Sequence, residues 1–394
     1  MKTVDSFSFD GKRALIRVDY NVPLDVDMNI QDDSRIVASM PTIKKILKDG
    51  GSVVLMSHLG RPKKGPEHQY SLQHLASHIE ELSGASVSFS NDCISDDSLK
   101  TSHNLPIGSI HLLENLRFYK EETIGDNSFA ERLATHGDIY VNDAFGTAHR
   151  AHASTSIVAN YMKEKCFGYL MAKEVSNATM LMKNPNRPLT AIVGGAKVSD
   201  KLLIIQNLLN VADHIIVGGG MAYTFMQALG GTIGNSLFEE DRINTCLEIL
   251  KEAEQKNVKI HLPEDSVIAD DFNNNATTQY CDSNNIPEGW MGLDIGEKAI
   301  QSFTDVISNS KTILWNGPMG VFEMSSFENG TKFIAGAVAQ ATQHGAFSLI
   351  GGGDSSAAVK KFGFTQDVSY ISTGGGALLE FFEGKELPGI MAIQ

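Results

Sequence analysis

Short apolar segments, each followed by a loop rich in glycine or charged residues, recur along the whole chain. They end at Val18, Ser57, Leu113, Val141, Val193, Val217, Leu262, Trp315 and Ile350. Helical patterns lie between them, and strands that alternate with helices form parallel, doubly wound sheets. The chain has 394 residues, which exceeds what one ordinary core organises. We therefore predict an α/β protein with two Rossmann-like lobes.

A connector between the two lobes is expected near the middle of the chain. Residues 173–183 have the pattern of a helix, and the proline-rich stretch 184–188 stops it. We place an N-terminal domain at 1–172, a connector helix or hinge at 173–187 and a C-terminal domain from residue 188 onward.

The stretch 189–201 at the midpoint carries the densest information. Residues 189–193 are apolar or β-branched and predict a buried strand. After Gly194 and Gly195, an apolar stripe predicts a helix with Lys197 and Lys201 in its first turns. Two lysines four residues apart at a helix N-terminus repel each other unless an anion lies between them. A polyphosphate would supply that anion. The alternative is that both lysines extend into water.

Charge and cysteine spacing exclude several protein classes. The formal net charge of -14 disfavours broad binding to nucleic acids or membrane surfaces, although it permits a local basic pocket. Four widely spaced cysteines indicate neither a zinc site nor a disulfide framework. The N-terminus has no apolar signal segment, so we expect a cytoplasmic protein.

The predicted loops are equipped differently in the two halves. In such sheets ligands bind beyond the carboxyl ends of the strands, where these loops lie. The first half supplies Arg35, His58, Arg61, Arg117, His149 and Arg150. Guanidinium groups grip small anions bidentately, so this half suits a strongly anionic molecule. The second half supplies glycines, two lysines and an aspartate, which suits the phosphates of a nucleotide.

Three glycine clusters in the second half precede predicted helices. They are Gly194-Gly195, Gly351-Gly352-Gly353 and Gly374-Gly375-Gly376. Asp354 follows the second cluster and could hold Mg²⁺, or it could simply cap the helix. The chain lacks both Gly-x-Gly-x-x-Gly after a strand and Gly-x-x-x-x-Gly-Lys-Ser/Thr, which disfavours a dehydrogenase and a P-loop enzyme.

Several other polar residues allow a functional and a structural interpretation. Asp19 and Asn21 could orient a substrate hydroxyl, or they could form buried hydrogen bonds. Arg61 could bind an anion or form a salt bridge. Glu323 could accept hydrogen bonds from a ribose, or it could be an exposed glutamate without a role.

The loops together resemble those of the phosphoglycerate kinase family from one end of the chain to the other. The matching motifs are RVDYNVP at 17–23, SHLGRP at 57–62, LENLRF at 113–118, NDAFGTAHRAH at 142–152, GGAKVSDK at 194–201, WNGPMGVFE at 315–323, GGGD at 351–354 and STGGG at 372–376. The resemblance implies a bilobed monomer that transfers a phosphoryl group reversibly between ATP and 3-phosphoglycerate with Mg²⁺. It also implies that the C-terminal domain spans 188–372 and that residues 373–394 pack back on the N-terminal domain.

Site residues follow from the same resemblance, position by position. Those expected to bind phosphoglycerate are Asp19, Asn21, Arg35, His58, Arg61, Arg117 and Arg150. Those expected to bind the nucleotide are Gly194, Lys197, Lys201, Gly219, Asn316, Pro318, Glu323, Gly351, Gly352, Gly353, Asp354 and Ser355, with Asp354 on the metal. Those expected to act on the transferring group are Arg35, Lys197, Gly353 and Gly375. The chain departs from the family pattern at Tyr20, Glu297, Ser355 and Leu378.

The chemistry of a carboxylate acceptor agrees with this assignment. A carboxylate with a pKa of roughly 3 to 4 is ionised at neutral pH, so no catalytic base is needed. Positioning and charge neutralisation remain, and closure of the lobes around residues 173–187 should exclude water. The alternatives are a kinase for acetate or carbamate, a nicotinamide-dependent dehydrogenase of 2-hydroxy acids, and a non-catalytic nucleotide-binding scaffold.

Overall fold

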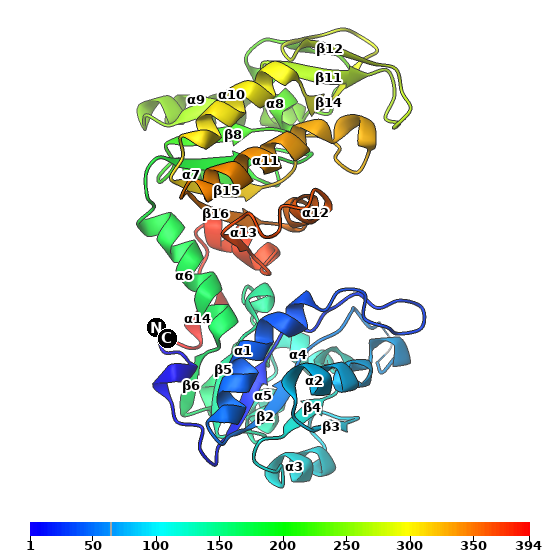
Figure 1. Ribbon diagram of the computed structural model, residues 1–394, viewed down its shortest axis with the longest axis vertical. Coiled ribbons are helices and arrows are strands. Elements are labelled where there is room, and N and C mark those ends of the chain that lie inside the picture. The colour runs from blue at the N-terminus through cyan, green and yellow to red at the C-terminus, as the bar shows by residue number, and fades with distance from the viewer. Residues whose placement is uncertain (64) are drawn as a thin grey trace. The chain divides into compact units, whose positions relative to one another are not determined.

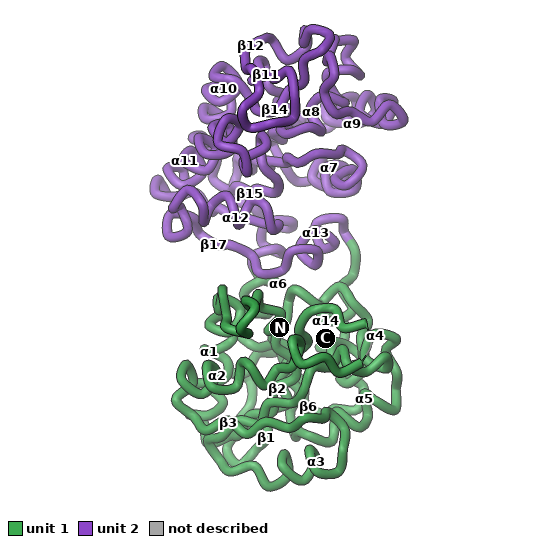
Figure 2. The backbone as a smooth tube through the Cα atoms, turned by 90° about the vertical axis from the view of Figure 1, so that its right-hand side faces the viewer, with its two compact units in different colours: residues 1–176, 385–394 green, residues 177–384 purple. Residues whose placement is uncertain are grey.

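The computed structural model describes residues 1–63 and 65–394 and divides the chain into two compact units (Figures 1 and 2). Unit 1 comprises Met1–Ser176 and Lys385–Gln394, and unit 2 comprises Asn177–Gly384. The division confirms two separately packed bodies. Within the described residues, no helix is long and apolar enough to cross a membrane.

Unit 1 is built on a six-stranded parallel sheet with the strand order β3-β4-β2-β1-β5-β6. The strands are β1 (Arg13–Arg17), β2 (Ser52–Met56), β3 (Val87–Ser90), β4 (Ile110–Leu113), β5 (Ile139–Asn142) and β6 (Glu164–Phe167). The helices are α1 (Ser34–Lys48), α2 (Ala76–Ser83), α3 (Asp96–His103), α4 (Lys120–Ile124), α5 (Asn127–Ala134), the first part of α6 (Tyr169–Lys183) and α14 (Pro388–Met391). The expected βα alternation is confirmed here.

Burial on both faces explains why the strands of unit 1 are continuously apolar. All five residues of β2 are buried, and so are all four residues of β4. Helices cover a parallel sheet on both sides, so its strands lack the alternation of a half-exposed sheet. Helix α1 contributes Ile36 and Ile43 to the same core. It contains Pro41 in its interior, and the helix continues through this proline from Ser34 to Lys48.

Unit 2 contains a second six-stranded parallel sheet with the order β10-β8-β7-β15-β16-β17. Its strands are β7 (Leu189–Val193), β8 (His214–Val217), β10 (Lys259–His261), β15 (Thr312–Asn316), β16 (Phe347–Gly351) and β17 (Tyr370–Ile371). Its helices are α7 (Leu202–Leu208), α8 (Met221–Ala228), α9 (Ile243–Gln255), α10 (Glu297–Ser308), α11 (Asn329–Gln343), α12 (Gly353–Lys361) and α13 (Gly376–Phe382). Two parallel sheets confirm the α/β class for the whole chain.

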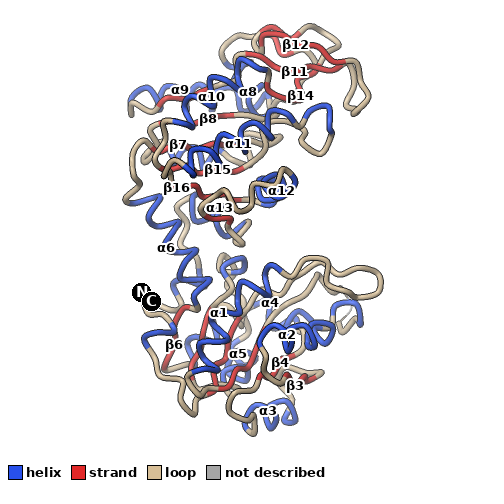
Figure 3. Tube along the Cα trace, viewed as in Figure 1, coloured by secondary structure: helices blue, strands red, loops and turns tan. Residues whose placement is uncertain are grey.

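A smaller antiparallel sheet in unit 2 has no counterpart in our sequence-based expectation. It has the order β12-β11-β14, formed by β12 (Thr278–Asp282), β11 (Asp265–Ala269) and β14 (Met291–Ile295) (Figure 3). Separately, β9 (Thr232–Ile233) forms a parallel pair with β13 (Asn285–Ile286). Strand β12 is mostly exposed and polar. An exposed polar strand gives no hydrophobic periodicity, which is why the sequence did not reveal it.

Helix α6 crosses the boundary between the units, which falls between Ser176 and Asn177. The helix ends at Lys183 as expected but begins at Tyr169 rather than Lys173. Asp143 explains the earlier start, because its Oδ1 accepts a hydrogen bond from the Met171 amide at 3.0 Å. A carboxylate that caps a helix from 28 residues away leaves no local signal in the sequence.

The C-terminal segment joins unit 1 later than the expected boundary at residue 373. Helix α13 stays in unit 2, where the Asn207 amide group donates to the Phe382 carbonyl at 2.6 Å. Of the segment 373–394, only the residues from Lys385 onward belong to unit 1. There the Gly389 amide donates to the Ala148 carbonyl at 2.8 Å, and the Asn142 side chain donates to the Gly389 carbonyl at 3.1 Å.

Candidate active site

The strand register of unit 1 brings its predicted binding loops to one edge of the sheet. Arg17 at the end of β1 is in register with Met56 of β2 and with Asn142 of β5. The loops that follow these three strands therefore start side by side. Strand β1 is also where the strand order changes direction, since the chain proceeds to β2 on one side and β5 lies on the other. Ligands bind at such switch points.

Arg17, which we did not predict as a site residue, lies beneath these loops and is almost completely buried. Its Nε donates to Ser154 Oγ at 2.8 Å, and the same hydroxyl donates to Glu122 Oε1 at 2.6 Å. A further nitrogen of its guanidinium group donates to the Val18 carbonyl. Buried charges require partners of this kind. In the sequence Arg17 lies within the apolar segment that ends at Val18, where its charge gives no hint of function.

Arg17 also fixes the state of His58. Its Nη2 lies 3.2 Å from His58 Nδ1. Because a guanidinium can only donate, Nδ1 accepts and the imidazole proton is on Nε2. Burial, and then the charges of Arg17, Arg117, Arg150 and Arg35, lower the pKa of His58 well below its ordinary value. His58 is therefore a neutral donor through Nε2.

Asp19 and Asn21 organise the predicted loop that follows β1. Asp19 Oδ2 accepts from Arg35 Nη1 at 2.8 Å, and Asn21 Oδ1 accepts from the Gly60 amide at 2.7 Å. Arg117 Nη1 donates to the Gly60 carbonyl at 2.6 Å. Asp19 and Asn21 thus form the hydrogen bonds of their structural interpretation. The same contacts hold the guanidinium groups of Arg35 and Arg117 beside the loop.

The guanidinium groups of unit 1 are close enough to disturb one another. Burial, followed by the charges of Arg150, Arg17 and Arg61, lowers the pKa of Arg117 to about 10, and Asp19 partly opposes this effect. Four cations around one carboxylate are unfavourable until an anion joins them. On a chain of net charge -14, this local excess of positive charge is a candidate anion-binding site.

Arg150 adds its charge to the positive region, next to the imidazoles of His149 and His152. Arg150 Nε donates to His149 Nε2 at 3.1 Å, so this imidazole nitrogen is an acceptor. Burial, followed by the charges of Arg17 and Arg150, lowers the pKa of His152 to about 4. Arg61 is exposed, and of the predicted phosphoglycerate ligands it is the one most open to solvent.

In unit 2 the loops after β7 and β15 pack directly on each other. The Gly194 amide donates to the Asn316 carbonyl at 2.9 Å, and the Gly195 amide donates to the Pro318 carbonyl at 3.2 Å. A Cβ on Gly194 would lie 2.1 Å from the Pro318 carbonyl oxygen, so this position admits only glycine. Close approach of two loops therefore accounts for Gly194 without a ligand.

The position of the two lysines corrects one prediction. Helix α7 begins at Leu202, so Lys197 lies in the preceding loop and Lys201 is the N-cap residue. The two lysines therefore do not share the first turns of a helix. Lys201 Nζ donates to Asn316 Oδ1, and Nδ2 of the same asparagine donates to the Gly351 carbonyl at 2.8 Å. Glycine at 194 and 195 lets the chain turn before the helix starts, a conformation that apolar periodicity does not reveal.

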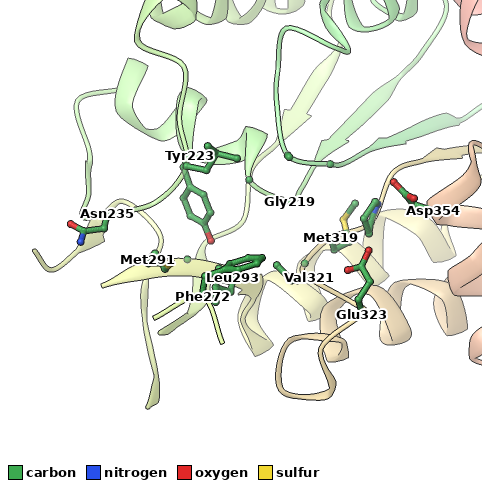
Figure 4. A pocket seen from close by; sticks show the side chains of 17 residues that line it. Gly219, Tyr223, Asn235, Phe272, Met291, Leu293, Met319, Val321, Glu323 and Asp354 are labelled. Carbon is green, nitrogen blue, oxygen red and sulfur yellow. The ribbon is translucent and has the colours of Figure 1, made fainter. Parts of the chain in front are cut away.

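A cavity of about 510 Å³ lies beside these loops within unit 2 (Figure 4). Gly219, Tyr223, Leu237, Phe272, Leu293, Pro318, Glu323 and Asp354 are among the residues that line it. Its glycine-rich and apolar walls have the character of a small-molecule site. Figure 4 shows the carboxylates of Glu323 and Asp354 near one end and Asn235 at the other end. Phe272 and Leu237 were not predicted, because isolated exposed apolar residues have no motif.

In the glycine cluster at the start of α12, backbone conformation explains the glycine at 352, whereas the protein itself gives no reason for a glycine at 353. Gly352 has a φ of +90°, which favours glycine. Gly353 is the first residue of α12, has no positive φ, and would carry a Cβ with no other heavy atom within 4 Å. The same open space surrounds Gly375. Asp354 is exposed in the first turn, whereas Ser355 is fully buried and accepts from the Gly317 amide at 2.6 Å.

The remaining departures from the family pattern have simple physical explanations. The Tyr20 hydroxyl is buried and hydrogen-bonded to Ser39 Oγ at 2.8 Å. Glu297 is the first residue of α10, where a negative charge suits the helix dipole. Leu378 is fully buried, and its Cδ2 would lie 2.6 Å from a Cβ on Gly351. All three substitutions are accommodated.

The donors available to a divalent cation are few. No group of three or more histidine, cysteine, aspartate or glutamate residues within 1–63 and 65–394 could bind a metal by itself. Asp354 is an exposed carboxylate in the lining of the cavity. Mg²⁺ is commonly held by one or two carboxylates together with substrate phosphates, so the donor set fits that ion when a nucleotide is present.

Comparison with known proteins gives a consistent result. The family model described as phosphoglycerate kinase matches residues 4–385. A phosphoglycerate kinase of Porphyromonas gingivalis is 50% identical, with 100% of both chains covered. The cytosolic phosphoglycerate kinase of Nicotiana tabacum is 49% identical, and the match covers 97% of this chain and 95% of the tobacco chain. The solved phosphoglycerate kinase of Coxiella burnetii has a TM-score of 0.91 at 39% identity over 99% and 98% of the two chains.

Proposed function

The chain belongs to the phosphoglycerate kinase family, and we propose that unit 1 binds 3-phosphoglycerate while unit 2 binds ATP. Phosphoglycerate kinase activity in glycolysis is its function, so it is a phosphotransferase with a carboxyl group as acceptor. The reaction forms a bond between a carboxylate oxygen of 3-phosphoglycerate and the γ-phosphorus of ATP. The bond from that phosphorus to the bridging oxygen breaks, which leaves ADP, and the reverse reaction uses the same groups.

The arginine cluster supports the assignment of the acceptor to unit 1. 3-Phosphoglycerate carries a phosphate and a carboxylate, and several forked guanidinium groups suit two such anions. We assign its binding to Arg61, Arg117 and Arg150, with His58 donating through Nε2. Asp19 and Asn21 would accept or donate at the substrate hydroxyl. Acetate or carbamate would leave most of these cations without a partner.

The cavity and the glycine loops support the assignment of ATP to unit 2. The base and ribose would occupy the cavity, with Glu323 accepting from ribose hydroxyls. The phosphates would lie on the amides at Gly351–Ser355 and beside Lys197 and Lys201, since amides of a helix N-terminus and ammonium groups attract anions. The open space around Gly353 leaves room for such an approach.

No general base is required for this transfer. The acceptor carboxylate is ionised at neutral pH, so the protein needs only to orient the two substrates and neutralise the charge that moves with the phosphoryl group. We assign that neutralisation to Lys197, Arg35 and the amides of Gly353 and Gly375. Removing one such group from a water-excluded site costs about 100- to 1000-fold in rate in comparable enzymes.

Asp354 is the residue that would hold Mg²⁺ together with the phosphates. The ion supplies charge neutralisation at the phosphate oxygens when it is bound. Burial lowers the pKa of the Lys201 ammonium group, and the charges of Asp200 and then Asp354 oppose this effect, so the Asp354 carboxylate lies near this lysine.

We also propose that the active form is a cytoplasmic monomer in which substrate binding draws the two units together, with the hinge near residues 173–187. Transfer in line requires the bound substrates to meet, and exclusion of water prevents hydrolysis of ATP and of the acyl phosphate. Small-angle scattering with both substrates should give a smaller radius of gyration than without them. Unchanged dimensions would contradict the closure, and a dimer mass would contradict the monomer.

The single observation that carries the assignment is the contrast between a cluster of guanidinium groups in unit 1 and a glycine-lined cavity in unit 2. A coupled assay of ADP formation tests it. We expect turnover with ATP and 3-phosphoglycerate and turnover at the background rate with acetate or carbamate. Equal rates with all three acceptors would refute the assigned substrate.

A further inference from the structure

The loop that carries Lys197 has little intrinsic rigidity. This segment, which we call the Lys197 loop, comprises Gly195–Lys201 between β7 and α7. Gly195 at its start has a φ of +119° and no neighbouring atom near a Cβ position. Lys197 is exposed. A loop that follows two glycines samples many conformations unless other contacts hold it.

Contacts fix the end of this loop. The side chain of Val198 is fully buried, and the Lys201 amide donates to the Val198 carbonyl at 2.9 Å. Lys201 Nζ donates to Asn316 Oδ1. These contacts secure the loop near α7, but they do not reach the side chain of Ser199, which lies two residues from Lys197.

Glu239 supplies the contact at Ser199. Its carboxylate accepts two hydrogen bonds from this residue, from the amide to Oε2 at 2.9 Å and from Oγ to Oε1 at 2.6 Å. The Glu239 amide donates to Thr224 Oγ1 at 3.1 Å, and Thr224 is buried in α8. Helix α8 follows Gly219 and Gly220, which line the nucleotide cavity. Glu239 therefore connects the Lys197 loop to a rigid wall of that cavity.

The charge of Lys197 acts on the same carboxylate. Burial raises the pKa of Glu239, but hydrogen bonds from Ser199 and Val198 and the charge of Lys197 lower it below its ordinary value. Glu239 is thus an anion that orders the backbone around Lys197, and the Lys197 ammonium group is near enough for its charge to act on the carboxylate. Charge-assisted hydrogen bonds of this kind are about twice as strong as neutral ones.

We infer that Glu239 is a positioning residue for phosphoryl transfer, because it holds the Lys197 loop so that the Lys197 ammonium group meets the transferring phosphate. The inference rests on the proposed role of Lys197. Glu239 itself touches neither substrate in this account. Its removal should therefore reduce the rate of the chemical step more than it reduces substrate binding.

Glu239→Gln tests the inference, since glutamine keeps the length but loses the charge and one acceptor. We expect kcat to fall about tenfold, while KM for ATP and for 3-phosphoglycerate changes less than about threefold. Ser199→Ala removes the hydroxyl donor from the other side of the same contact and should give a smaller loss of the same kind. It also replaces Glu239→Gln as the probe if that variant does not fold.

A double-mutant cycle separates positioning from a purely structural role. In the Lys197→Ala background, Glu239→Gln should change kcat less than about twofold, because the residue it positions is already absent. Multiplicative losses from the two substitutions would overturn the inference while leaving the proposed function intact. If Lys197→Ala alone left kcat unchanged, the assigned role of Lys197 and the inference would both fail.

Glu240 provides a matched control. It neighbours Glu239, is exposed and starts the 3₁₀ helix Glu240–Arg242. Glu240→Gln changes the net charge by the same amount and should leave kcat within about 1.5-fold of the unmodified protein. An equal loss in Glu240→Gln and Glu239→Gln would indicate a general charge effect and overturn the inference.

Discussion

The proposed anion sites of units 1 and 2 each lie at the carboxyl edge of a parallel sheet, but they consist of different chemical groups. In unit 1 the loops after β1, β2 and β5 present guanidinium and imidazole groups, and in unit 2 the loops after β7, β15 and β16 present glycines. A compact substrate with two anionic ends suits forked side chains. A polyphosphate attached to a bulky base suits amides that the substrate can approach closely.

The two solutions also have different structural requirements. The guanidinium group of Arg17 must be held by Ser154 and Val18, because a buried charge without partners is costly. In unit 2 the requirement falls on the backbone, where Gly194 and Gly317 allow two loops to touch. Side-chain substitutions should therefore damage binding in unit 1, whereas a methyl group on a glycine should be enough to damage it in unit 2.

The largest expected effect is that of Lys197→Ala. Loss of an ammonium group from the transferring phosphate should lower kcat about 100- to 1000-fold with little change in either KM. Steady-state kinetics with both substrates measures this effect. Lys298→Ala, at an exposed lysine of the same unit paired with Asp282, is the control and should retain normal kcat. A rise in KM for ATP without loss of kcat would remove Lys197 from the catalytic group.

Arg61→Ala should have the next largest effect, and it tests the division of substrates between the units. Loss of charge-assisted hydrogen bonds should raise KM for 3-phosphoglycerate about 10- to 100-fold and leave the Kd of ATP within about twofold. Isothermal titration with each substrate separates the two quantities. Arg132→Ala removes an exposed arginine of unit 1 that pairs with Asp96, and both affinities should survive it. Loss of ATP binding in Arg61→Ala would reverse our assignment of the units.

Gly353→Ala should have a smaller effect that separates binding from stability. A methyl group at this position meets no protein atom, and alanine favours a helix over glycine. The melting temperature should therefore stay unchanged or rise slightly, while the Kd of ATP rises about tenfold because the methyl group obstructs the approach of phosphate to the backbone. Gly194→Ala is the contrasting variant, since its methyl group meets the Pro318 carbonyl and should lower the melting temperature. If Gly353→Ala bound ATP normally, backbone approach at this position would be refuted.

The smallest effect is an acid sensitivity of unit 1. Ser102 Oγ lies between His111 Nδ1 at 2.8 Å and His136 Nδ1 at 2.6 Å, and all three residues are buried. Burial, and then the other imidazole, lower the pKa of His111 to about 4, and burial also lowers the pKa of His136 to about 4. The unfolded chain binds these protons from about pH 6.5 downward, so stability is present above that pH and is lost as the pH falls toward 4.

We expect each imidazole to cost about 1 kcal/mol of unfolding free energy per pH unit below pH 6. Thermal unfolding between pH 7 and pH 5 measures the slope, and His111→Asn should flatten it. An unchanged slope in His111→Asn would contradict the role of the histidine pair.

In unit 2 the sign of the pH dependence is opposite for Asp294, because burial raises its pKa to about 7. That carboxyl stabilises the fold most below about pH 4 and loses this contribution as the pH rises to 7.

Much of the fold could be predicted because buried parallel strands are short apolar runs. The strand predicted at 189–193 has those bounds in the structure, and the apolar segment predicted to end at Leu113 forms a strand that ends there. The predicted start of helix α7 is too early in the sequence. Val198 continues the apolar stripe of the helix and is buried, but it lies in the loop before the helix. The antiparallel strands were missed because β12 exposes a polar surface.

The site was predictable where a charged residue follows a strand and was not where function depends on distant contacts. Asp19, His58 and Asn316 follow or end strands, and the structure places them at the carboxyl edges of the two sheets. Arg17 also ends a strand, but its guanidinium group is buried, and its role emerges only from its contact with Ser154, 137 residues away. Glu239 looks like one of several solvated acidic residues until Ser199 is seen beside it. Hydrogen bonds between distant segments leave no periodic signal.

The return of residues 385–394 to unit 1 determines the order in which this unit can be assembled during synthesis. A ribosome makes unit 1 up to Ser176 first, then unit 2, and only afterwards the segment containing Gly389, which bonds to Ala148 and Asn142. The loop that carries His149 and Arg150 therefore receives this support only after unit 2 has been synthesised. A chain cut before residue 385 would lack this backing behind Arg150, which ties the assembly of the proposed acceptor site in unit 1 to the synthesis of unit 2.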